Sequence, residues 1–342
     1  MLIKKTRIPV THILLIGFLP SPLKKMVYRL KGYKIGPGVK LSLGCVVIGE
    51  SVEIGEKSSI GFFTIVKARH IKIARFVKIG AMSAIDTERI SIDDDARINE
   101  QVYIGGTKTP ESSLTLGKRT IIMQMSYINP TKPIVIGDDS GVGGHCLLFT
   151  HGSWNSQLEG YPVKFAPITI GKKVWLPWRV FIMPGVTIGD QVVVGAESMI
   201  NRDIPSNCLV AGSPAKIIKE NFPAPITEAE KTKLVHEMFA EFIAYLEYHG
   251  FTTGQKITGN GFDITLAKGS MRAFIQYTDS LPAQAPAVSN HVILLSKGTA
   301  SLPSGYNMVC ALGDNSRIGT SDAGEELVTF LSRYGVRFNR LD

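Results

Sequence analysis

Residues 168–200 read ITIGKKVWLPWRVFIMPGVTIGDQVVVGAESMI, with an aliphatic residue at every sixth position of the register. These positions are Ile170, Leu176, Ile182, Ile188, Val194 and Ile200. A period of six fits neither a helix, which repeats every 3.6 residues, nor a simple strand, which repeats every two. A coil of three short strands has this period, because each strand directs one aliphatic residue inward before the next corner.

The same register recurs nearer the N-terminus in shorter, phase-shifted runs. The runs are Ile48, Ile54, Ile60; Ile73, Ile79, Ile85; Ile92, Ile98, Ile104; Leu116, Ile122, Ile128; and Ile136, Val142, Leu148. Stacked coils bury a continuous aliphatic column, so the repeat predicts a mainly β prism of triangular coils. The phase breaks near residues 107–113 and 150–167 predict loops that leave the prism.

The 342 residues are 44% hydrophobic and 20% charged, which is typical of globular rather than disordered proteins. This length predicts one large and one small domain. We divide the chain into a basic, apolar arm (1–34), the repeat prism (35–222) and a small α+β domain (223–342). The four cysteines form no CxxC pair, which predicts free thiols in a reducing cytoplasm.

The net charge of +9 comes from the N-terminal region. Residues 1–49 hold nine Lys and Arg and no acid, which leaves 29 basic and 29 acidic residues elsewhere. The apolar run 8–19 is too short to span a bilayer and lacks a signal-peptide cleavage site. Cations beside apolar residues suit an anionic membrane surface, whereas a helix capping the open end of the core is the alternative, and both can hold. No basic-aromatic cluster recurs later, which disfavours nucleic acid as a partner.

Residues 205–219 continue the stretch as PSNCLVAGSPAKIIK, and the whole segment resembles the hexapeptide-repeat acyltransferases. A tryptophan-containing coil, a PGVTIG turn and a closing AGSPAK segment are typical of their galactoside, maltose and xenobiotic O-acetyltransferase branch. The resemblance covers about residues 35–220. It implies a left-handed parallel β-helix, acetyl-CoA as co-substrate without a metal, and a trimer whose prisms bind the coenzyme between them.

His151 is the candidate general base. It lies in the predicted loop and precedes Trp175 by 24 residues, the spacing that the resemblance implies for the catalytic histidine. A hydroxyl is a weak nucleophile at neutral pH, and histidine titrates in the range needed to take its proton. We therefore expect direct transfer, with backbone N–H groups holding the oxyanion. The alternative for His151 is a structural loop histidine bonded to a backbone carbonyl. Covalent catalysis by cysteine is disfavoured, because Cys45 and Cys146 fall at inward positions where a thiol is inert.

The resemblance also implies residues that bind the two substrates. Tyr127 and Asn129 match a Tyr-x-Asn turn near the acceptor, although Asn129 can equally be a turn former. The positions that match coenzyme contacts are Trp178, Gly195, Ala196, Asn201, Arg202, Lys216 and Lys219. For the two lysines a solvated helix face is the alternative. Pro177 and Trp178 stand where the family has a glycine and a small residue, so we expect the indole to affect specificity.

Residues 223–342 carry no catalytic motif that the sequence reveals. Thr227 and Glu230 predict a capping box at the start of a helix that runs to about Tyr248. We expect strands near 272–277, 291–296 and 307–311, a second helix over 323–334 and a strand over 336–341. A role in acceptor recognition or oligomer contacts is left open.

These features predict a CoA-dependent O-acetyltransferase for a saccharide hydroxyl of a cell-envelope glycan or its precursor. The nearest rival is an N-acetyltransferase on an amino sugar nucleotide, and a non-catalytic scaffold prism is another. A metal-dependent hydratase needs three converging histidines, whereas this sequence offers His145 and His151 with no third histidine in a neighbouring coil. We expect a cytoplasmic homotrimer, with peripheral contact at the inner face of the membrane through residues 1–34.

Overall fold

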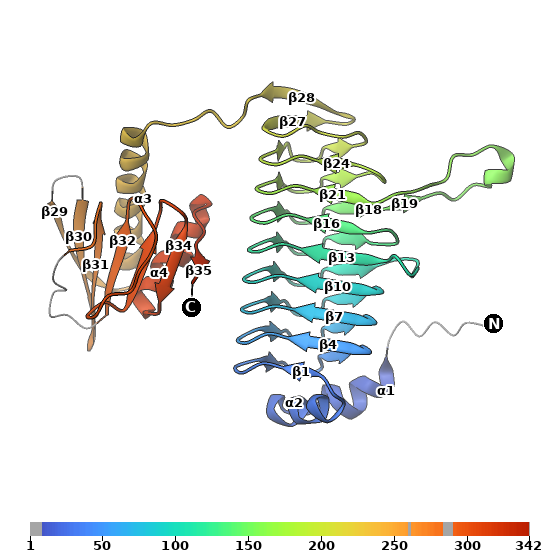
Figure 1. Cartoon of the computed structure of the whole chain (residues 1–342), viewed down its shortest axis with the longest axis horizontal. Coiled ribbons are helices and arrows are strands. Elements are labelled where there is room, and N and C mark those ends of the chain that lie inside the picture. The colour runs from blue at the N-terminus through green and yellow to red at the C-terminus, as the bar shows by residue number, and fades with distance from the viewer. Residues whose placement is uncertain (1–8, 259–260, 283–289, 342) are drawn as a thin grey trace. The chain divides into compact units, whose positions relative to one another are not determined.

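The computed structural model describes residues 9–258, 261–282 and 290–341, and the chain divides into two compact units, Met1–Ala224 and Pro225–Asp342. In the first unit the chain climbs through successive triangular coils, each made of three short strands (Figure 1). Residues 1–8 of the predicted arm lie outside the described residues.

Three sheets form the faces of the prism, and the chain passes from face A to B to C in every coil. Face A contains β1 (Lys34–Ile35), β4 (Ser51–Ile54), β7 (His70–Ile73), β10 (Arg89–Ile92), β13 (Ser113–Leu116), β16 (Ile134–Ile136), β21 (Ile168–Ile170) and β24 (Thr187–Ile188). Face B contains β2 (Lys40–Leu41), β5 (Ser59–Ile60), β8 (Lys78–Ile79), β11 (Arg97–Ile98), β14 (Ile121–Ile122), β17 (Gly141–Val142), β22 (Trp175–Leu176), β25 (Val193–Val194), β27 (Cys208–Gly212) and β28 (Ala215–Glu220). Face C contains β3 (Val46–Ile48), β6 (Ile65–Lys67), β9 (Ala84–Asp86), β12 (Tyr103–Gly105), β15 (Tyr127–Asn129), β18 (Leu147–Phe149), β23 (Phe181–Ile182) and β26 (Met199–Ile200).

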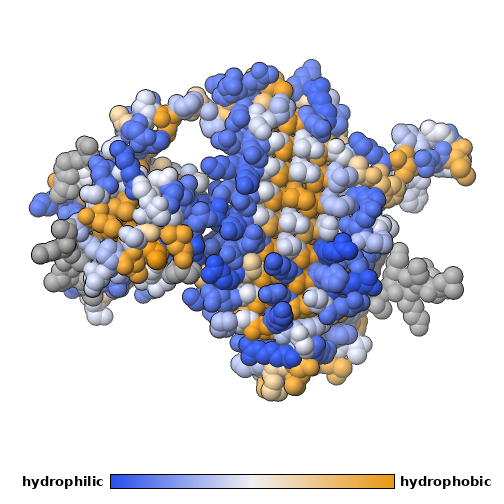
Figure 2. Space-filling view, viewed as in Figure 1, coloured by the Kyte–Doolittle hydropathy of each residue, from blue (hydrophilic) through white to orange (hydrophobic). Residues whose placement is uncertain are grey.

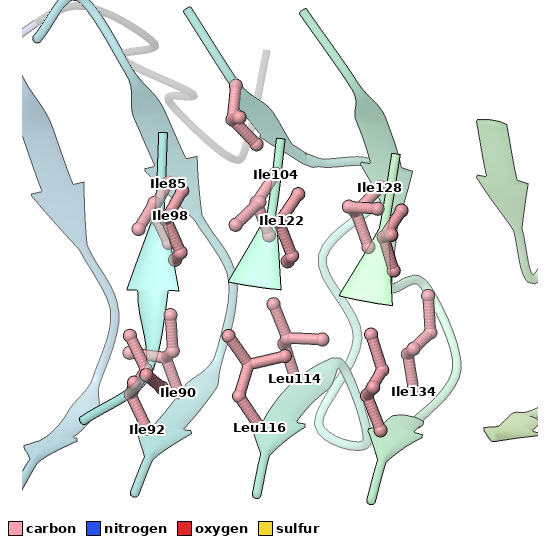
Figure 3. Close-up of a cluster of buried hydrophobic side chains, with 14 of the residues drawn as sticks. Ile85, Ile90, Ile92, Ile98, Ile104, Leu114, Leu116, Ile122, Ile128 and Ile134 are labelled. Carbon is pink, nitrogen blue, oxygen red and sulfur yellow. The ribbon is translucent and has the colours of Figure 1, made fainter. Parts of the chain in front are cut away.

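The interior of the prism is the predicted aliphatic column, except that Val47 and not Ile48 is buried in the first coil. Residues at equivalent positions of successive coils stack in parallel register, as Ile79, Ile98 and Ile122 do on face B, and all three are buried. Figure 3 shows a section of this column. The predicted fold class, a left-handed parallel β-helix prism with a small α+β domain, is confirmed.

Buried hydroxyls tie one coil to the next at the corners. Ser58 Oγ donates to the carbonyl of Ala74 at 2.7 Å and accepts from the backbone N–H of Val77 at 3.0 Å. Thr64 repeats the arrangement, donating to Gly80 O at 2.6 Å. These bonds satisfy backbone groups that a tight corner leaves without a strand partner.

A helical cap closes one end of the column. It consists of α1 (Val10–His12), the π-helical turn η1 (Ile13–Gly17) and α2 (Ser21–Leu30). Lys24 and Tyr28, one turn apart on α2, are fully buried against the first coils. Lys24 Nζ donates to the carbonyls of Gly17 (3.0 Å), Ser42 (2.7 Å) and Cys45 (3.1 Å). The described part of the arm, residues 9–34, therefore caps the open end of the core, which was the alternative to membrane contact.

The second unit is an α+β sandwich of one sheet and two main helices. The sheet runs in order through β29 (Thr252–Thr258), β30 (Gly261–Lys268), β31 (Met271–Thr278), β32 (His291–Leu295), β33 (Met308–Ala311), β34 (Ser316–Gly319) and β35 (Asn339–Arg340), and the helices are α3 (Glu228–Tyr248), α4 (Asp322–Leu331) and the short η3 (Ser332–Tyr334). The predicted capping box is present, since Thr227 Oγ1 accepts from Glu230 N and Glu230 Oε2 accepts from Thr227 N. The hairpin β29–β30 was not predicted from sequence.

The column makes a prediction about stability. Ile98→Ala removes a side chain packed between Ile79 and Ile122, so we expect a loss of about 2–5 kcal/mol in the free energy of unfolding. Arg97→Ala changes the exposed neighbour on the same strand and is expected to stay within about 0.5 kcal/mol of the parent. Urea unfolding of the two variants checks this, and equal losses would contradict the column as the source of stability.

A buried histidine makes the second unit sensitive to pH. His291 is fully buried between the rings of Phe274 and Tyr306, and neither ring nitrogen has a partner among the described residues. Burial lowers the pKa of His291. Below about pH 6.5 the unfolded chain therefore binds a proton that the folded unit excludes, and stability falls as pH drops toward the lowered pKa.

We expect His291→Phe to remove this loss of stability at low pH, whereas the exposed His249→Gln should retain it. The protein is equilibrated in urea at several pH values between about 5 and 8. Each sample is then pulse-labelled with deuterium at one common pH, so that the labelling chemistry is the same for all samples. Peptides from the second unit then report its unfolding. An unchanged pH slope in His291→Phe would refute the assignment.

Candidate active site

The histidine predicted as general base lies at the root of a hairpin that leaves the prism (Figure 1). β19 (His151–Gly152) pairs antiparallel with β20 (Lys164–Phe165), and the turn η2 (Gln157–Glu159) lies between them. His151 faces Phe165 across the pair, with ring centroids 5.2 Å apart and 9° between the planes. The imidazole is half-buried, and its buried Nδ1 has no hydrogen-bond partner in the described part of the chain. Stacking on Phe165 therefore sets the orientation of the ring.

Thr150 anchors this hairpin to the prism. Its side chain donates to the carbonyl of Asn129 at 2.7 Å and accepts from the backbone N–H of Lys132 at 2.9 Å. Its own carbonyl accepts from Ala166 N at 3.0 Å, which closes the hairpin beside His151. A fully buried hydroxyl thus fixes the residue that directly precedes the histidine.

The structure places Asn129 in the same cluster. Asn129 ends β15 on face C, one coil before the hairpin, and is 4% exposed. Its Oδ1 accepts from Thr131 Oγ1 at 2.8 Å, and a Cβ on Gly106 would lie 2.1 Å from that oxygen. The side chain is therefore packed into the support of the hairpin, and its predicted role in acceptor binding stays a prediction.

Tyr127 belongs to an aromatic row on the outside of face C. Its ring makes edge contacts with Tyr103 and Phe149, both at 4.9 Å, and Phe149 in turn meets Phe181 at 5.8 Å. Tyr103 remains 41% exposed. Tyr103, Tyr127 and Phe181 begin their strands, whereas Phe149 ends β18 next to the edge between faces C and A (the C–A edge), from which the His151 hairpin leaves. The row therefore offers flat apolar rings on the face that precedes the hairpin.

Several of the predicted coenzyme residues lie on a different edge. Trp178 and Ala196 occupy successive corners between faces B and C (the B–C edge), where Glu197 N donates to the carbonyl of Trp178 at 3.0 Å. The indole is 44% exposed and lies over Gly144, with its ring centroid 5.6 Å from that of His145. One prism therefore holds the histidine and Trp178 on opposite sides of face C.

The remaining predicted coenzyme positions lie near the last coils. Gly195 is half-buried, and a Cβ there would come within 2.7 Å of Ala211 Cβ. Asn201 and Arg202 are exposed where the chain leaves β26 on the C–A edge, and Arg202 donates to Ala215 O at 3.2 Å. The alternative of a helix face for Lys216 and Lys219 is wrong, because both lie exposed on β28; they form a cationic strand that closes the prism.

Curated relatives match part of the chain. No protein-family model matches the chain. A putative colanic acid biosynthesis acetyltransferase of Escherichia coli is 37% identical over 107 residues, which are 31% of this chain and 58% of the relative. A putative lipopolysaccharide biosynthesis O-acetyl transferase of Escherichia coli is 32% identical over 131 residues, or 38% and 60% of the two chains. The galactoside O-acetyltransferase of Escherichia coli is 54% identical over 54 residues, or 16% and 27%.

The chain is therefore similar to acetyltransferases over part of its length. The match spans about three-fifths of the length of the first two relatives and about a quarter of the third. Among solved structures, the polySia-specific acetyltransferase NeuO aligns with 61% of this chain and 97% of its own length, at 21% identity and a TM-score of 0.35.

Within this hexapeptide-repeat prism the cysteines are poorly suited to covalent catalysis. All four are free and buried. Burial raises the pKa of Cys146 to about 11, and its thiol points at the carbonyl of Pro177, 2.9 Å away. A thiol that is protonated and enclosed at neutral pH is a weak nucleophile. The described residues also contain no group of three or more His, Cys, Asp or Glu placed to hold a metal ion.

The packing of Trp178 gives a stability prediction for the B–C edge. In Gly144→Ala the new Cβ would lie 2.4 Å from Trp178 Cζ3, so the indole must shift, and we expect a loss of about 1–3 kcal/mol. Trp178→Ala removes the clash, so the losses in the free energy of unfolding should not add in a double-mutant cycle measured by urea unfolding. Gly152→Ala is the control, since nothing lies within 4 Å of its Cβ position. Strict additivity would mean that the indole does not lie over Gly144.

Proposed function

We propose that the chain transfers an acetyl group from acetyl-CoA to a hydroxyl of a saccharide, in a cell-envelope glycan or its precursor. The observation that carries the proposal is His151, an imidazole oriented by an aromatic stack at the root of a hairpin on this prism. Relatives named for colanic acid and lipopolysaccharide biosynthesis support a glycan as the acceptor.

The proposed reaction is a direct transfer with His151 as general base. The imidazole takes the proton of the acceptor hydroxyl as its oxygen attacks the thioester carbonyl carbon. Collapse of the tetrahedral intermediate breaks the C–S bond, and the imidazolium returns the proton to the thiolate of the coenzyme. The products are an acetyl ester and free CoA. Backbone N–H groups near the hairpin hold the negative charge on the carbonyl oxygen.

The coenzyme and the histidine meet between two prisms in this proposal. His151 and Trp178 lie on different edges of one prism, so a groove formed by two copies brings one histidine to the other copy's B–C edge. Lys216, Lys219 and Arg202 supply positive charge for the phosphates of CoA. We therefore propose a cytoplasmic homotrimer, with membrane contact through the N-terminal region.

His151→Ala tests the catalytic role. We expect kcat to fall by about 10²–10⁴-fold, because the acceptor hydroxyl loses its base, while calorimetric titration still shows acetyl-CoA binding. Activity is followed by release of the CoA thiol with envelope polysaccharide as acceptor.

His70→Ala is the matched control, since His70 is exposed on β7 in a distant coil and should leave kcat unchanged. Undiminished turnover in His151→Ala would refute the general base. An absence of acetyl-CoA binding to the parent protein would refute the transferase itself.

A further inference from the structure

The cap at the foot of the prism has two opposite faces. On α2, Lys24 and Tyr28 point into the prism, whereas Leu23, Met26 and Leu30 are exposed at the spacing of one helical stripe. Leu30 is 81% exposed. An amphipathic helix normally buries its apolar stripe, but here a lysine and a tyrosine face the core and the apolar stripe faces outward.

The preceding turn extends this apolar surface. Leu14, Leu15 and Phe18 are exposed on η1 and directly after it, at 65%, 70% and 49%. Figure 2 shows hydrophobic residues gathered at the end of the prism where Figure 1 places α1 and α2. We call the six residues Leu14, Leu15, Phe18, Leu23, Met26 and Leu30 the cap face.

The surroundings of the cap face are positively charged. Arg29, Lys31 and Lys34 are exposed beside it, and Lys25 is half-buried on the same helix. None of these four forms a salt bridge with a described residue. The first carboxylate in the sequence is Glu50. Arg29 also donates to the carbonyl of Ile35 at 2.8 Å, and Lys34 lies opposite Glu53 in the sheet, so Lys25 and Lys31 are the cations most open to an external anionic partner.

We infer that the cap face docks on the surface of an anionic phospholipid bilayer. Exposed leucines, a methionine and a phenylalanine insert at the boundary of headgroups and acyl chains, and the surrounding cations lie at the level of the phosphates. Among the described helices none is long and apolar enough to cross a bilayer. The inference deepens the membrane contact of the proposed function, and it is measured without acetyl transfer, so each can fail alone.

The charge pattern favours lipid over a second copy of the chain. Two copies meeting through this surface would bring their unpaired cations together, with no acid among the first 49 residues to offset them. An anionic bilayer offers phosphates at one depth and hydrocarbon just beneath it. A bilayer therefore provides a partner for both the apolar side chains and the cations of the cap.

Flotation of the full-length protein with lipid vesicles tests the inference. We expect it to float with vesicles in which about a third of the phosphatidylcholine is replaced by phosphatidylglycerol, and to be released by high salt. Lys25→Gln with Lys31→Gln should weaken binding by about 30-fold, at about 1 kcal/mol for each lysine. Leu15→Ser with Leu30→Ser should weaken it by about tenfold.

Ile257→Ser with Lys118→Gln is the control, because it removes one exposed aliphatic residue and one exposed lysine far from the cap in sequence. It should float like the parent. Parent-like flotation of both cap variants, or no binding to anionic vesicles, overturns the inference. Larger assemblies of the parent than of Leu15→Ser/Leu30→Ser in sedimentation without lipid would overturn it in favour of contact between copies.

Discussion

The aliphatic column is the constraint on which the rest of the first unit depends. A strand of two or three residues buries its inward side chain only when the coils above and below place a similar side chain at the same point, as Ile79 and Ile122 do for Ile98. All coils must therefore keep one cross-section. Additional residues are accommodated only outside, at the corners. The loop after β12 and the hairpin with His151 are such additions, which is why the candidate chemistry lies outside the column.

A column of this kind has two open ends, and the chain closes them differently. At the C-terminal end β28 folds back antiparallel on β27. At the N-terminal end α2 covers the first coils, and Lys24 donates to three carbonyls, that of Gly17 in the cap and those of Ser42 and Cys45 in the first coil. A buried ammonium group without a carboxylate is stable only with such a full set of acceptors. Because the polar face of α2 is used inward, its apolar face remains outward.

The aliphatic column could be predicted from the sequence because it depends on local spacing. Contacts between residues that are distant in the sequence could not be predicted. The column from Ile170 to Ile200 follows from a fixed period, and every predicted member is buried. The orienting role of Phe165 and the anchor at Thr150 arise only when distant residues are brought together across the hairpin. The strand β29 was not predicted because its residues are mostly polar and lie at the edge of a sheet, so no apolar alternation marks them. Its partner β30 was not predicted either, although Phe262, Ile264 and Leu266 alternate along it. Lys24 was missed because a lysine on a short helix is normally solvated.

The proposed docking through the cap and the proposed acetyl transfer at His151 constrain each other. The hairpin leaves after β18, the sixth strand of face C counted from the cap. Neighbouring strands are about 4.8 Å apart, so five spacings place the hairpin about 24 Å from the first coil. A prism standing on its cap then holds His151 well beyond the reach of a lipid headgroup. The acceptor hydroxyl must belong to a sugar that extends from the membrane or diffuses freely, which favours a long glycan or a soluble precursor over a sugar attached directly to lipid.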